Sequence, residues 1–420
     1  MAIKKDSMYY RFCLYGFLKN QRFFDPFIIL FFREMGMSFL EIGTLFSIRE
    51  IATNILEIPT GVIADAYGRR KSMIYAFISY IISFAIFYLF PRFYVYAIAM
   101  IFFASGEAFR SGTHKAMILE YLRIKGMKDK KVEYYGHTRS ASQFGSAVSS
   151  LIAIAIVFYA RSYRPVFLIS IIPYIMGLIL MFTYPAYLDG IQEEVKGRWK
   201  QRVTERFKRT MRDFLSMFKS VEALKAIFNS AIFDGFFKSS KDYLQPILKA
   251  QALLLPVLLY LGEKQRVAII VGVVYFFLYI LTSLASRNAG KVVSRIGSLT
   301  RAINNTFLLG GILLFISGLS TNLNIPSIAI CSYILFYILQ NMRRPMNVGY
   351  ISDNIPSTTM ASGLSVESQL KTISMAILAP IIGFLADKTG VGNALIIISI
   401  VFIALFIPLK VGKGRAETTG

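Results

Sequence analysis

The sequence predicts an all-α integral membrane protein whose twelve transmembrane helices form two pseudo-symmetric six-helix bundles. Of its 420 residues, 55% are hydrophobic and 17% are charged, whereas soluble domains carry about 25% charged residues. The apolar residues form blocks of about 20, the length that crosses roughly 30 Å of hydrocarbon. Cationic residues gather in the loops between these blocks, as expected on the cytoplasmic side of a membrane.

The twelve apolar blocks define the predicted spans. The connections after the second, fourth, sixth and eighth spans are rich in Lys and Arg, while those after the first, third, fifth, ninth and eleventh carry few. This asymmetry predicts a multi-pass protein of the cell (cytoplasmic) membrane with both termini in the cytoplasm. It also accounts for the net charge of +23 without a nucleic-acid partner. The spans are placed at about 10–33, 38–64, 72–90, 93–122, 134–159, 163–185, 221–246, 265–287, 300–320, 325–350, 360–386 and 391–410.

The longest connection, about 190–219, divides the spans six and six, giving an N-terminal bundle at 1–189 and a C-terminal bundle at 220–420. Apolar residues recur in it every three or four positions, and Lys and Arg fill the remaining arc over 196–212. This pattern is typical of a basic amphipathic helix on an anionic membrane surface, although a plain linker fits equally well. The segment 247–264 is too short and proline-broken for a span, and an extracellular interfacial helix is one interpretation.

Internal repeats connect the two halves. Three motifs recur in the same order at a separation of about 226 to 233 residues, and such duplication is common in transporters. The first pair is Gly61-x-x-x-Asp65-x-x-Gly68 and Gly290-x-x-x-Ser294-x-x-Gly297. In the second pair, Glu107-x-x-Arg110 followed by His114 corresponds to Gln340-x-x-Arg343 followed by Asn347. The third pair is Ser142-Gln143 and Ser368-Gln369.

The loop after the second span reads GVIADAYGRRK from Gly61 to Lys71. Gly68 permits a tight turn, and Gly61 lets a neighbouring helix approach closely. Asp65 can bind cations or the N-terminus of a facing helix. Together with twelve spans divided six and six, this loop resembles the signature Gly-x-x-x-Asp-x-x-Gly-Arg-Arg/Lys of the major facilitator superfamily (MFS).

The resemblance implies the MFS fold and secondary active transport by alternating access, in which two bundles rock about a central site. It assigns a conformational latch that stabilises the outward-facing conformation, formed by Gly61, Asp65, Gly68, Arg69 and Arg70. The alternative is that the loop's charges serve only to set the membrane topology. That would explain its three cations, but neither the paired glycines nor Asp65. The Gly-Pro-rich motif that the family's drug antiporters carry in the fifth span is absent, which argues against multidrug export.

Ionisable residues within the spans are the candidates for the transport site, because each costs at least about 2.5–3.5 kcal/mol at the membrane centre. Many occur in the first, fourth, seventh and tenth spans, which line the central cavity in the superfamily that the chain resembles. In the fourth span, Glu107, Arg110 and His114 are expected on one stripe of a continuous helix. Cations outnumber acids, so we expect an anionic substrate. A cationic or neutral amphipathic substrate is one alternative. Neutralisation within the spans is another, because the pairs Arg22–Asp25, Glu107–Arg110 and Asp234–Lys238 are at helical contact spacing. The expected substrate-binding residues are Arg22, Arg110, Lys115, Lys238, Lys241, Arg343 and Lys371.

Protons are the expected coupling ion. Glu107 and His114 have the neutral counterparts Gln and Asn in the second half, which keeps hydrogen bonding but removes titratable groups. We therefore hypothesise that coupling is confined to the N-terminal half, with Glu107 or Asp25 as the carrier and with His114 able to change charge near neutral pH. The candidate proton-coupling residues are Asp25, Glu107, His114 and Asp234.

The predicted function is transport of a small, anionic solute across the cytoplasmic membrane, coupled to protons, with export by antiport slightly favoured. The alternatives are an exporter of cationic or neutral amphipathic drugs and an uncoupled facilitator. We expect no enzyme, because the sequence has no nucleophile placed with its base and no phosphate-binding loop for ATP. We also expect no cofactor, no metal and no nucleic-acid partner. The expected partners are the solute, protons and membrane lipids, and residues 196–212 are expected to bind the anionic leaflet of the membrane. The protein is expected to be a monomer.

Overall fold

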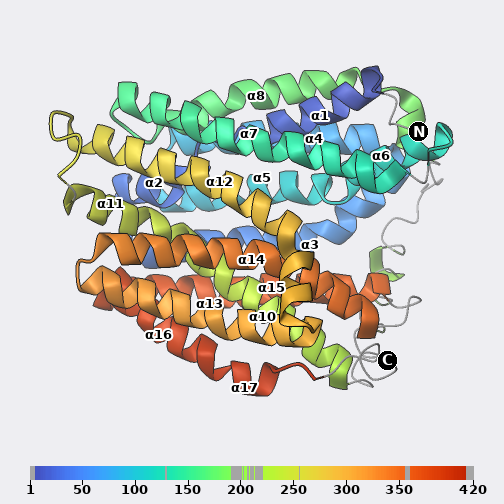
Figure 1. Ribbon diagram of the computed structural model, residues 1–420. Helices are drawn as coiled ribbons and strands as arrows, with labels where there is room; N and C mark the ends of the chain where they lie inside the picture. The colour runs from blue at the N-terminus through green and yellow to red at the C-terminus, as the bar shows by residue number, and fades with distance from the viewer. Residues whose placement is uncertain are drawn as a thin grey trace. The chain divides into compact units, whose positions relative to one another are not determined.

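The structure is a computed structural model that describes residues 5–127, 130–190, 221–254, 256–354 and 360–412, with a few residues between 201 and 212. Every regular element of these residues is a helix (Figure 1). The predicted basic helix at 196–212 lies almost entirely outside the described residues. The chain divides into two compact units, which we call unit 1 (Met1–Phe31 and Ile48–Arg206) and unit 2 (Phe32–Ser47 and Phe207–Gly420).

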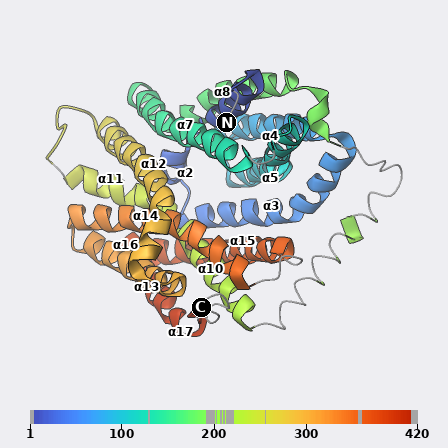
Figure 2. The same cartoon turned by 45° about the vertical axis from the view of Figure 1, so that its right-hand side comes forward.

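Unit 1 is built mainly from the first six predicted spans. Within it α4 packs against α5 and α8, and α1 packs against α7 and α8 (Figures 1 and 2). Residues 32–47, which we expected in the N-terminal bundle, group with unit 2 instead. The helices of the first half are α1 Ser7–Lys19, η1 Asp25–Phe27, α2 Ile28–Glu34, α3 Phe39–Tyr67, α4 Arg69–Leu89, α5 Phe93–Arg110, α6 Thr113–Ile124, α7 Lys131–Ala160, α8 Pro165–Phe182 and η3 Ala186–Asp189.

Unit 2 contains the helices of the last six predicted spans. Within it α13 packs against α14 and α16, α10 packs against α15, and α12 packs against α14 (Figure 2). The helices are α10 Val221–Ser240, η4 Lys241–Tyr243, α11 Leu244–Leu254, α12 Glu263–Ile296, α13 Leu299–Asn322, α14 Pro326–Asn354, α15 Met360–Thr389, α16 Val391–Ala404 and α17 Phe406–Leu409.

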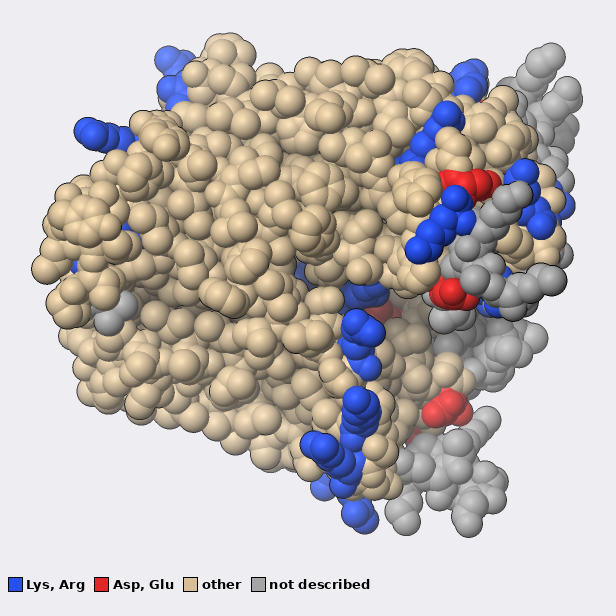
Figure 3. Space-filling model, turned by 45° about the horizontal axis from the view of Figure 1, so that its top comes forward, with Lys and Arg blue, Asp and Glu red and all other residues tan. Residues whose placement is uncertain are grey.

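Each of the twelve predicted spans has a helical counterpart in the described residues. Seven helical segments there are long and apolar enough to cross a membrane. Figure 3 shows broad areas of one face without charged side chains, while most Lys and Arg side chains lie toward its right-hand side. The seven segments are Arg69–Leu89, Phe93–Ile124, Glu133–Ala160, Pro165–Phe182, Glu263–Ile296, Leu299–Asn322 and Gly363–Thr389.

The first and seventh spans are broken helices, although we expected continuous ones. In the first span α1 ends at Lys19, and the helix resumes at η1, where Pro26 occupies the first turn. In the seventh span α10 ends at Ser240 and passes through η4 into α11. Because α11 continues this span to Leu254, the first part of the segment 247–264 belongs to the broken seventh span and is no separate interfacial helix.

The fourth span is also interrupted, which corrects one prediction about the site. The helix α5 ends at Arg110, and α6 begins at Thr113 after Gly112, whose φ of 71° lies in the left-handed region that favours glycine. His114 therefore belongs to α6. The expected single stripe of Glu107, Arg110 and His114 along one continuous helix is wrong.

Candidate functional site

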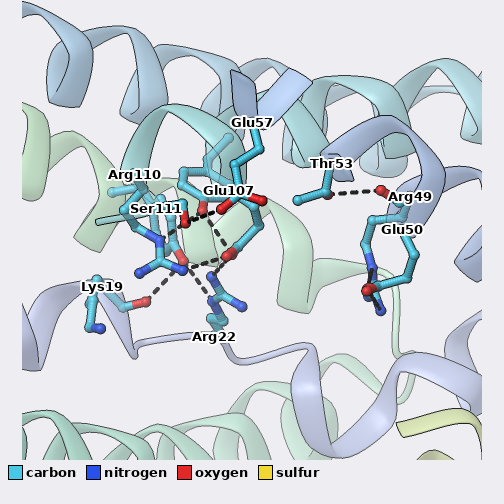
Figure 4. A network of polar contacts seen from close by, with 11 residues as sticks. Lys19, Arg22, Arg49, Glu50, Thr53, Glu57, Glu107, Arg110 and Ser111 are labelled. Atoms are coloured by element: carbon cyan, nitrogen blue, oxygen red, sulfur yellow. Dashed lines mark hydrogen bonds and ion pairs between the residues drawn. The ribbon is translucent and has the colours of Figure 1, made fainter. Parts of the chain in front are cut away.

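A carboxylate held by two arginines forms the centre of the site in unit 1. Arg22 binds one oxygen of Glu107 and Arg110 binds the other, while Tyr80 donates a hydrogen bond of 2.7 Å from its Oη to Glu107 Oε1. Lys19 lies beside these residues in Figure 4. We call Lys19, Arg22, Tyr80, Glu107 and Arg110 the Glu107 cluster. The i,i+3 contact of Glu107 with Arg110 is the one that the sequence spacing predicts.

The break in the first span positions Arg22. The Arg22 Nε donates to Tyr174 Oη at 3.0 Å, and Tyr174 Oη donates to the carbonyl oxygen of Lys19 at 2.9 Å. Gln21 Nε2 donates to the carbonyl of Gly145 on α7 at 3.0 Å. Neighbouring helices thus provide partners for polar groups that an unwound segment exposes. Broken helices of this kind mark substrate sites in many transporters.

The Glu107 cluster holds more positive than negative charge. The two guanidiniums face one carboxylate, and the side chains of Arg22, Arg110 and Glu107 are 22%, 25% and 22% exposed. Arg49 and Glu50, also labelled in Figure 4, form an ion pair with each other at 3.1 Å. This pair lies apart from Glu107 in the figure. The partly exposed arginines are therefore suited to bind an anion bidentately.

His114 lies in an aromatic environment. Its ring stacks on Tyr15 at 3.6 Å between centroids, and Phe12 approaches it edge-on at 5.4 Å. Its Nε2 is 3.2 Å from the hydroxyl of Tyr184. The described hydrogen-bond partner of His114 is thus Tyr184, which lies between α8 and η3, and the role of His114 in proton coupling stays a prediction.

A second polar cluster lies in unit 2 around Asp234 of α10. Lys371 Nζ is 3.5 Å from Asp234 Oδ2, and Gln340 Nε2 donates to Oδ1. Asn347 Nδ2 donates to Ser230 Oγ at 2.9 Å, and Ser230 Oγ donates to Glu367 Oε1 at 2.9 Å. We call the six residues Ser230, Asp234, Gln340, Asn347, Glu367 and Lys371 the Asp234 cluster.

The Asp234 cluster borders a cavity of about 120 Å³ that Arg344 also lines. A water molecule occupies about 30 Å³ of liquid volume, so the cavity could hold roughly four waters or one small polar group. From the sequence we counted Arg344 among the cations of the tenth span but not among the substrate-binding residues, and we did not expect Ser230 at a site. Only the packing of α10, α14 and α15 brings them to the cavity, so no local spacing could have identified them.

Arg343 occupies a different environment from the one we expected. Its side chain is fully buried and donates to the Ile303 carbonyl at 2.5 Å, to Thr306 Oγ1 at 2.8 Å and to Asn229 Oδ1 at 2.7 Å. Its guanidinium lies 4.1 Å from the centroid of Phe233. These contacts tie three helices together, and Arg343 does not line the cavity. We therefore remove it from the candidate substrate contacts.

Two predicted lysines make their described contacts outside both clusters. Lys241 pairs with Asp242 at 2.6 Å, and the exposed Lys115 lies 5.5 Å from the ring centroid of Tyr135. Lys238 is half-buried in the last turn of α10. Asp25, the other predicted carboxylate, begins η1 directly after the break that holds Arg22.

The loop after the second span begins α4 with the predicted tight turn. Gly68 has φ 97° and ψ 146°, a conformation that favours glycine. The backbone N–H of Arg70 donates to Asp189 Oδ1 at 2.7 Å, and Arg69 Nη1 is 3.5 Å from the carbonyl of Ala116. Asp65 is exposed at the end of α3. The loop is thus anchored within unit 1, and its role as a latch stays a prediction.

Comparison with known proteins places these features in a family. A sequence profile of the Major Facilitator Superfamily matches residues 20–374. The uncharacterized MFS-type transporter YxaM of Bacillus subtilis (strain 168) is 25% identical over 398 residues, which cover 92% of this chain and 90% of that protein.

Solved transporter structures share the fold. The nucleoside transporter NupG has a TM-score of 0.77 at 12% identity, with 96% of this chain and 100% of that chain covered. A D-xylose–proton symporter has a TM-score of 0.70 at 15% identity, with 97% and 98% covered. The family profile spans most of the sequence, and the similar proteins are transporters, so this membrane protein is a transporter and not an enzyme. The chain belongs to the Major Facilitator Superfamily.

Proposed function

We propose that this transporter moves a small anionic solute together with protons across the cell membrane by alternating access. The observation that carries the proposal is the convergence of Arg22 and Arg110 on the single carboxylate of Glu107 at the break in the first span. An anion that entered the cluster would find two guanidiniums whose planar donors match a carboxylate or a phosphate.

The same geometry supports a coupling mechanism. Glu107 and an anionic solute compete for Arg22 and Arg110, because the carboxylate already occupies donors of both guanidiniums. Protonation of Glu107 would weaken these two contacts and free the arginines for the solute. The proton and the anion then bind together, which corresponds to symport, whereas we favoured antiport from the sequence. The direction of net transport follows the gradients that the cell maintains.

The Asp234 cluster, within unit 2, offers mainly neutral groups for hydrogen bonding. Its acid is already matched by Lys371, and Ser230 and Asn347 supply neutral hydrogen-bonding groups at the cavity. This difference between the clusters supports the hypothesis that proton coupling resides in the N-terminal half. Lys371 would bind solute only after it moves from Asp234.

The orientation and the latch complete the proposal. We place both termini in the cytoplasm on the distribution of loop cations, and we treat the protein as a monomer. Asp65 then lies at the cytoplasmic end of α3. There it would hold the transporter outward-facing, together with Gly61, Gly68, Arg69 and Arg70.

A thermal-shift screen of the purified protein tests the substrate class. The panel contains organic carboxylates, sugar phosphates and cationic dyes, each measured at two pH values. We expect stabilisation by at least one anion, stronger at the lower pH because a protonated Glu107 leaves the arginines free. Stabilisation by the dyes alone would contradict the proposal, and anion binding with the opposite pH dependence would contradict the symport mechanism.

A further inference from the structure

The N-terminus of α3 is capped by a residue from a distant helix. The backbone N–H groups of Phe39 and Leu40 donate to the two carboxylate oxygens of Asp387, at 2.9 and 2.8 Å. Asp387 lies in the last turn of α15, almost 350 residues away in sequence, and both contacts lie within unit 2. A carboxylate at this position also interacts favourably with the positive end of the helix dipole.

Asp387 complements a cap that α3 makes for itself. Ser38 Oγ accepts a hydrogen bond from the N–H of Glu41 at 3.1 Å, and Glu41 Oε2 accepts one from the N–H of Ser38 at 2.8 Å. This capping box leaves the N–H groups of Phe39 and Leu40 for another acceptor. Asp387 therefore makes an interaction between helices that the local cap does not replace.

Close backbone contact accompanies this interaction. A Cβ on Gly383 would lie 2.2 Å from the carbonyl oxygen of Phe39, and a Cβ on Gly43 would lie 2.3 Å from that of Ala379. Ser47 Oγ, two turns further along α3, donates to the carbonyl of Ala376 at 2.6 Å. Small residues thus let the first turns of α3 pack directly on α15.

The sequence around Asp387 repeats the motif of the loop after the second span. Gly383-x-x-x-Asp387-x-x-Gly390 has the spacing of Gly61-x-x-x-Asp65-x-x-Gly68. The final glycines also share a conformation, because Gly390 has φ 85° and ψ 160° and Gly68 has φ 97° and ψ 146°, and each precedes the first residue of the next helix.

The counterpart that we expected from the sequence does not share this geometry. Gly297 has φ 79° and ψ −1° and ends α12 as a left-handed C-cap. Judged by the backbone conformation of its final glycine, the loop after the second span therefore resembles the loop after the eleventh span and not the loop after the eighth.

The two motifs lie on opposite sides of the membrane in the proposed orientation. With the termini in the cytoplasm, the connections after even-numbered spans are cytoplasmic and those after odd-numbered spans are external. Asp65 follows the second span and Asp387 follows the eleventh. The start of α3, which Asp387 binds, follows the first external connection.

We propose that Gly383, Asp387 and Gly390 form an external latch, which holds the start of α3 against the end of α15 and releases it when the transporter opens to the outside. Residues 39–47 of α3 group with unit 2 and residues 48–67 with unit 1, although the helix is continuous. Asp387 is thus a positioning residue for alternating access. The external latch rests on the proposed function, because it presupposes two alternating conformations.

Thiol labelling at position 47 tests the external latch. The reporter is Ser47→Cys in a background with Cys13→Ser and Cys331→Ser, because these are the two native cysteines. Ser47 is buried against Ala376, so it reacts with a membrane-impermeant maleimide only when α3 and α15 separate. Labelling is measured in right-side-out and in inside-out vesicles, and it needs no transported solute.

Asp387→Asn should raise the labelling rate from outside about tenfold. A factor of ten corresponds to about 1.4 kcal/mol, close to the lower end of the range for hydrogen bonds to charged groups. Asp65→Asn should lower the rate, because loss of the cytoplasmic latch favours the conformation that is closed to the outside. Lys388→Gln, a change at the exposed neighbouring residue, should have no effect.

Glu41→Ala separates a latch from simple fraying of the helix. It removes the local cap of α3 without touching Asp387, so the latch predicts a rate close to that of the reporter parent. Equal rates for Asp387→Asn and the parent would overturn the proposal, as would an equally large rise in Glu41→Ala. A rise seen only in inside-out vesicles would refute the external placement. Solute flux is measured separately, so failure of the external latch and failure of the proposed function give different results.

Discussion

Replacement of Glu107 by glutamine probes the charge balance of the Glu107 cluster directly. Glutamine keeps the shape of the side chain and an acceptor for Tyr80, but it leaves Arg22 and Arg110 without their shared counter-ion. Removing one partner of a fully buried ion pair costs about 3–5 kcal/mol. Because the side chains concerned are 22–25% exposed, we expect the free energy of unfolding of Glu107→Gln to fall by about 2 kcal/mol.

An anion should reverse this loss. A ligand at about 100 times its dissociation constant stabilises the folded state by about 2.7 kcal/mol, and in the variant it no longer competes with a carboxylate. Thermal unfolding in detergent, with and without the anion found in the screen, measures both effects. Glu57→Gln is the matched control, because Glu57 is exposed and its carboxylate accepts a hydrogen bond from Ser111 Oγ at 3.0 Å.

The outcome that refutes this reasoning is equally specific. If Glu107→Gln unfolds at the same temperature as the wild type, the arginines do not depend on the carboxylate for charge balance. If the anion stabilises the variant no more than it stabilises the wild type, Glu107 and the anion do not compete for the same donors. Glu57→Gln should match the wild type in both measurements.

Three further changes have defined outcomes. Arg343→Lys should lower the free energy of unfolding, measured by chemical denaturation, by about 2–4 kcal/mol, since an ammonium cannot replace all three buried hydrogen bonds. Arg344→Lys at the cavity is the control and should change the free energy of unfolding little. Gly68→Ala should lower the free energy of unfolding by about 1–3 kcal/mol, because φ 97° with ψ 146° is a conformation that residues other than glycine rarely adopt, and chemical denaturation measures the loss. Burial raises the pKa of Asp6, but hydrogen bonds from Tyr121 and from the backbone outweigh it and lower the pKa below its usual value. The stability from this carboxylate is therefore present above the unfolded pKa of about 3.9 and is lost as the pH falls through the lower folded pKa. Asp6→Asn should flatten that acid limb in stability measurements across pH, and an unchanged limb would contradict the assignment.

The fold was largely predictable because hydropathy alone reports membrane spans. Each apolar block became a helix, and the loop from Gly61 to Lys71 contains the predicted turn at Gly68. Contacts within one helix were predictable as well, as for Glu107 and Arg110 on α5. Both kinds of feature depend on residues close together in sequence.

The breaks in the helices were not predictable in the same way. The unwound segment after Lys19 is held by Tyr174 of α8 and by the Gly145 carbonyl of α7, partners that only the tertiary structure supplies. The i,i+3 spacing suggested that Arg22 would pair with Asp25. The helix is interrupted there, and Arg22 reaches Glu107 of α5.

The sequence also does not reveal which of two adjacent charged residues on a helix faces the site. Successive residues on a helix point about 100° apart, so of Arg343 and Arg344 only one can face a given neighbour. Asn229 and Thr306 bind Arg343, which leaves Arg344 at the cavity. Similarly Asp234 pairs with Lys371 of another helix, a partner that the spacing of residues along α10 does not indicate.

The central claim is that one carboxylate couples a proton to an anion, and proton movement in proteoliposomes tests it most directly. An inward gradient of the stabilising anion is imposed at equal pH on both sides, and a trapped pH-sensitive dye reports the interior. The account predicts that the interior acidifies with the wild-type protein, while Glu107→Gln carries labelled anion without a change in pH. Acidification that persists in Glu107→Gln, or an interior that becomes alkaline as the anion enters, would contradict it.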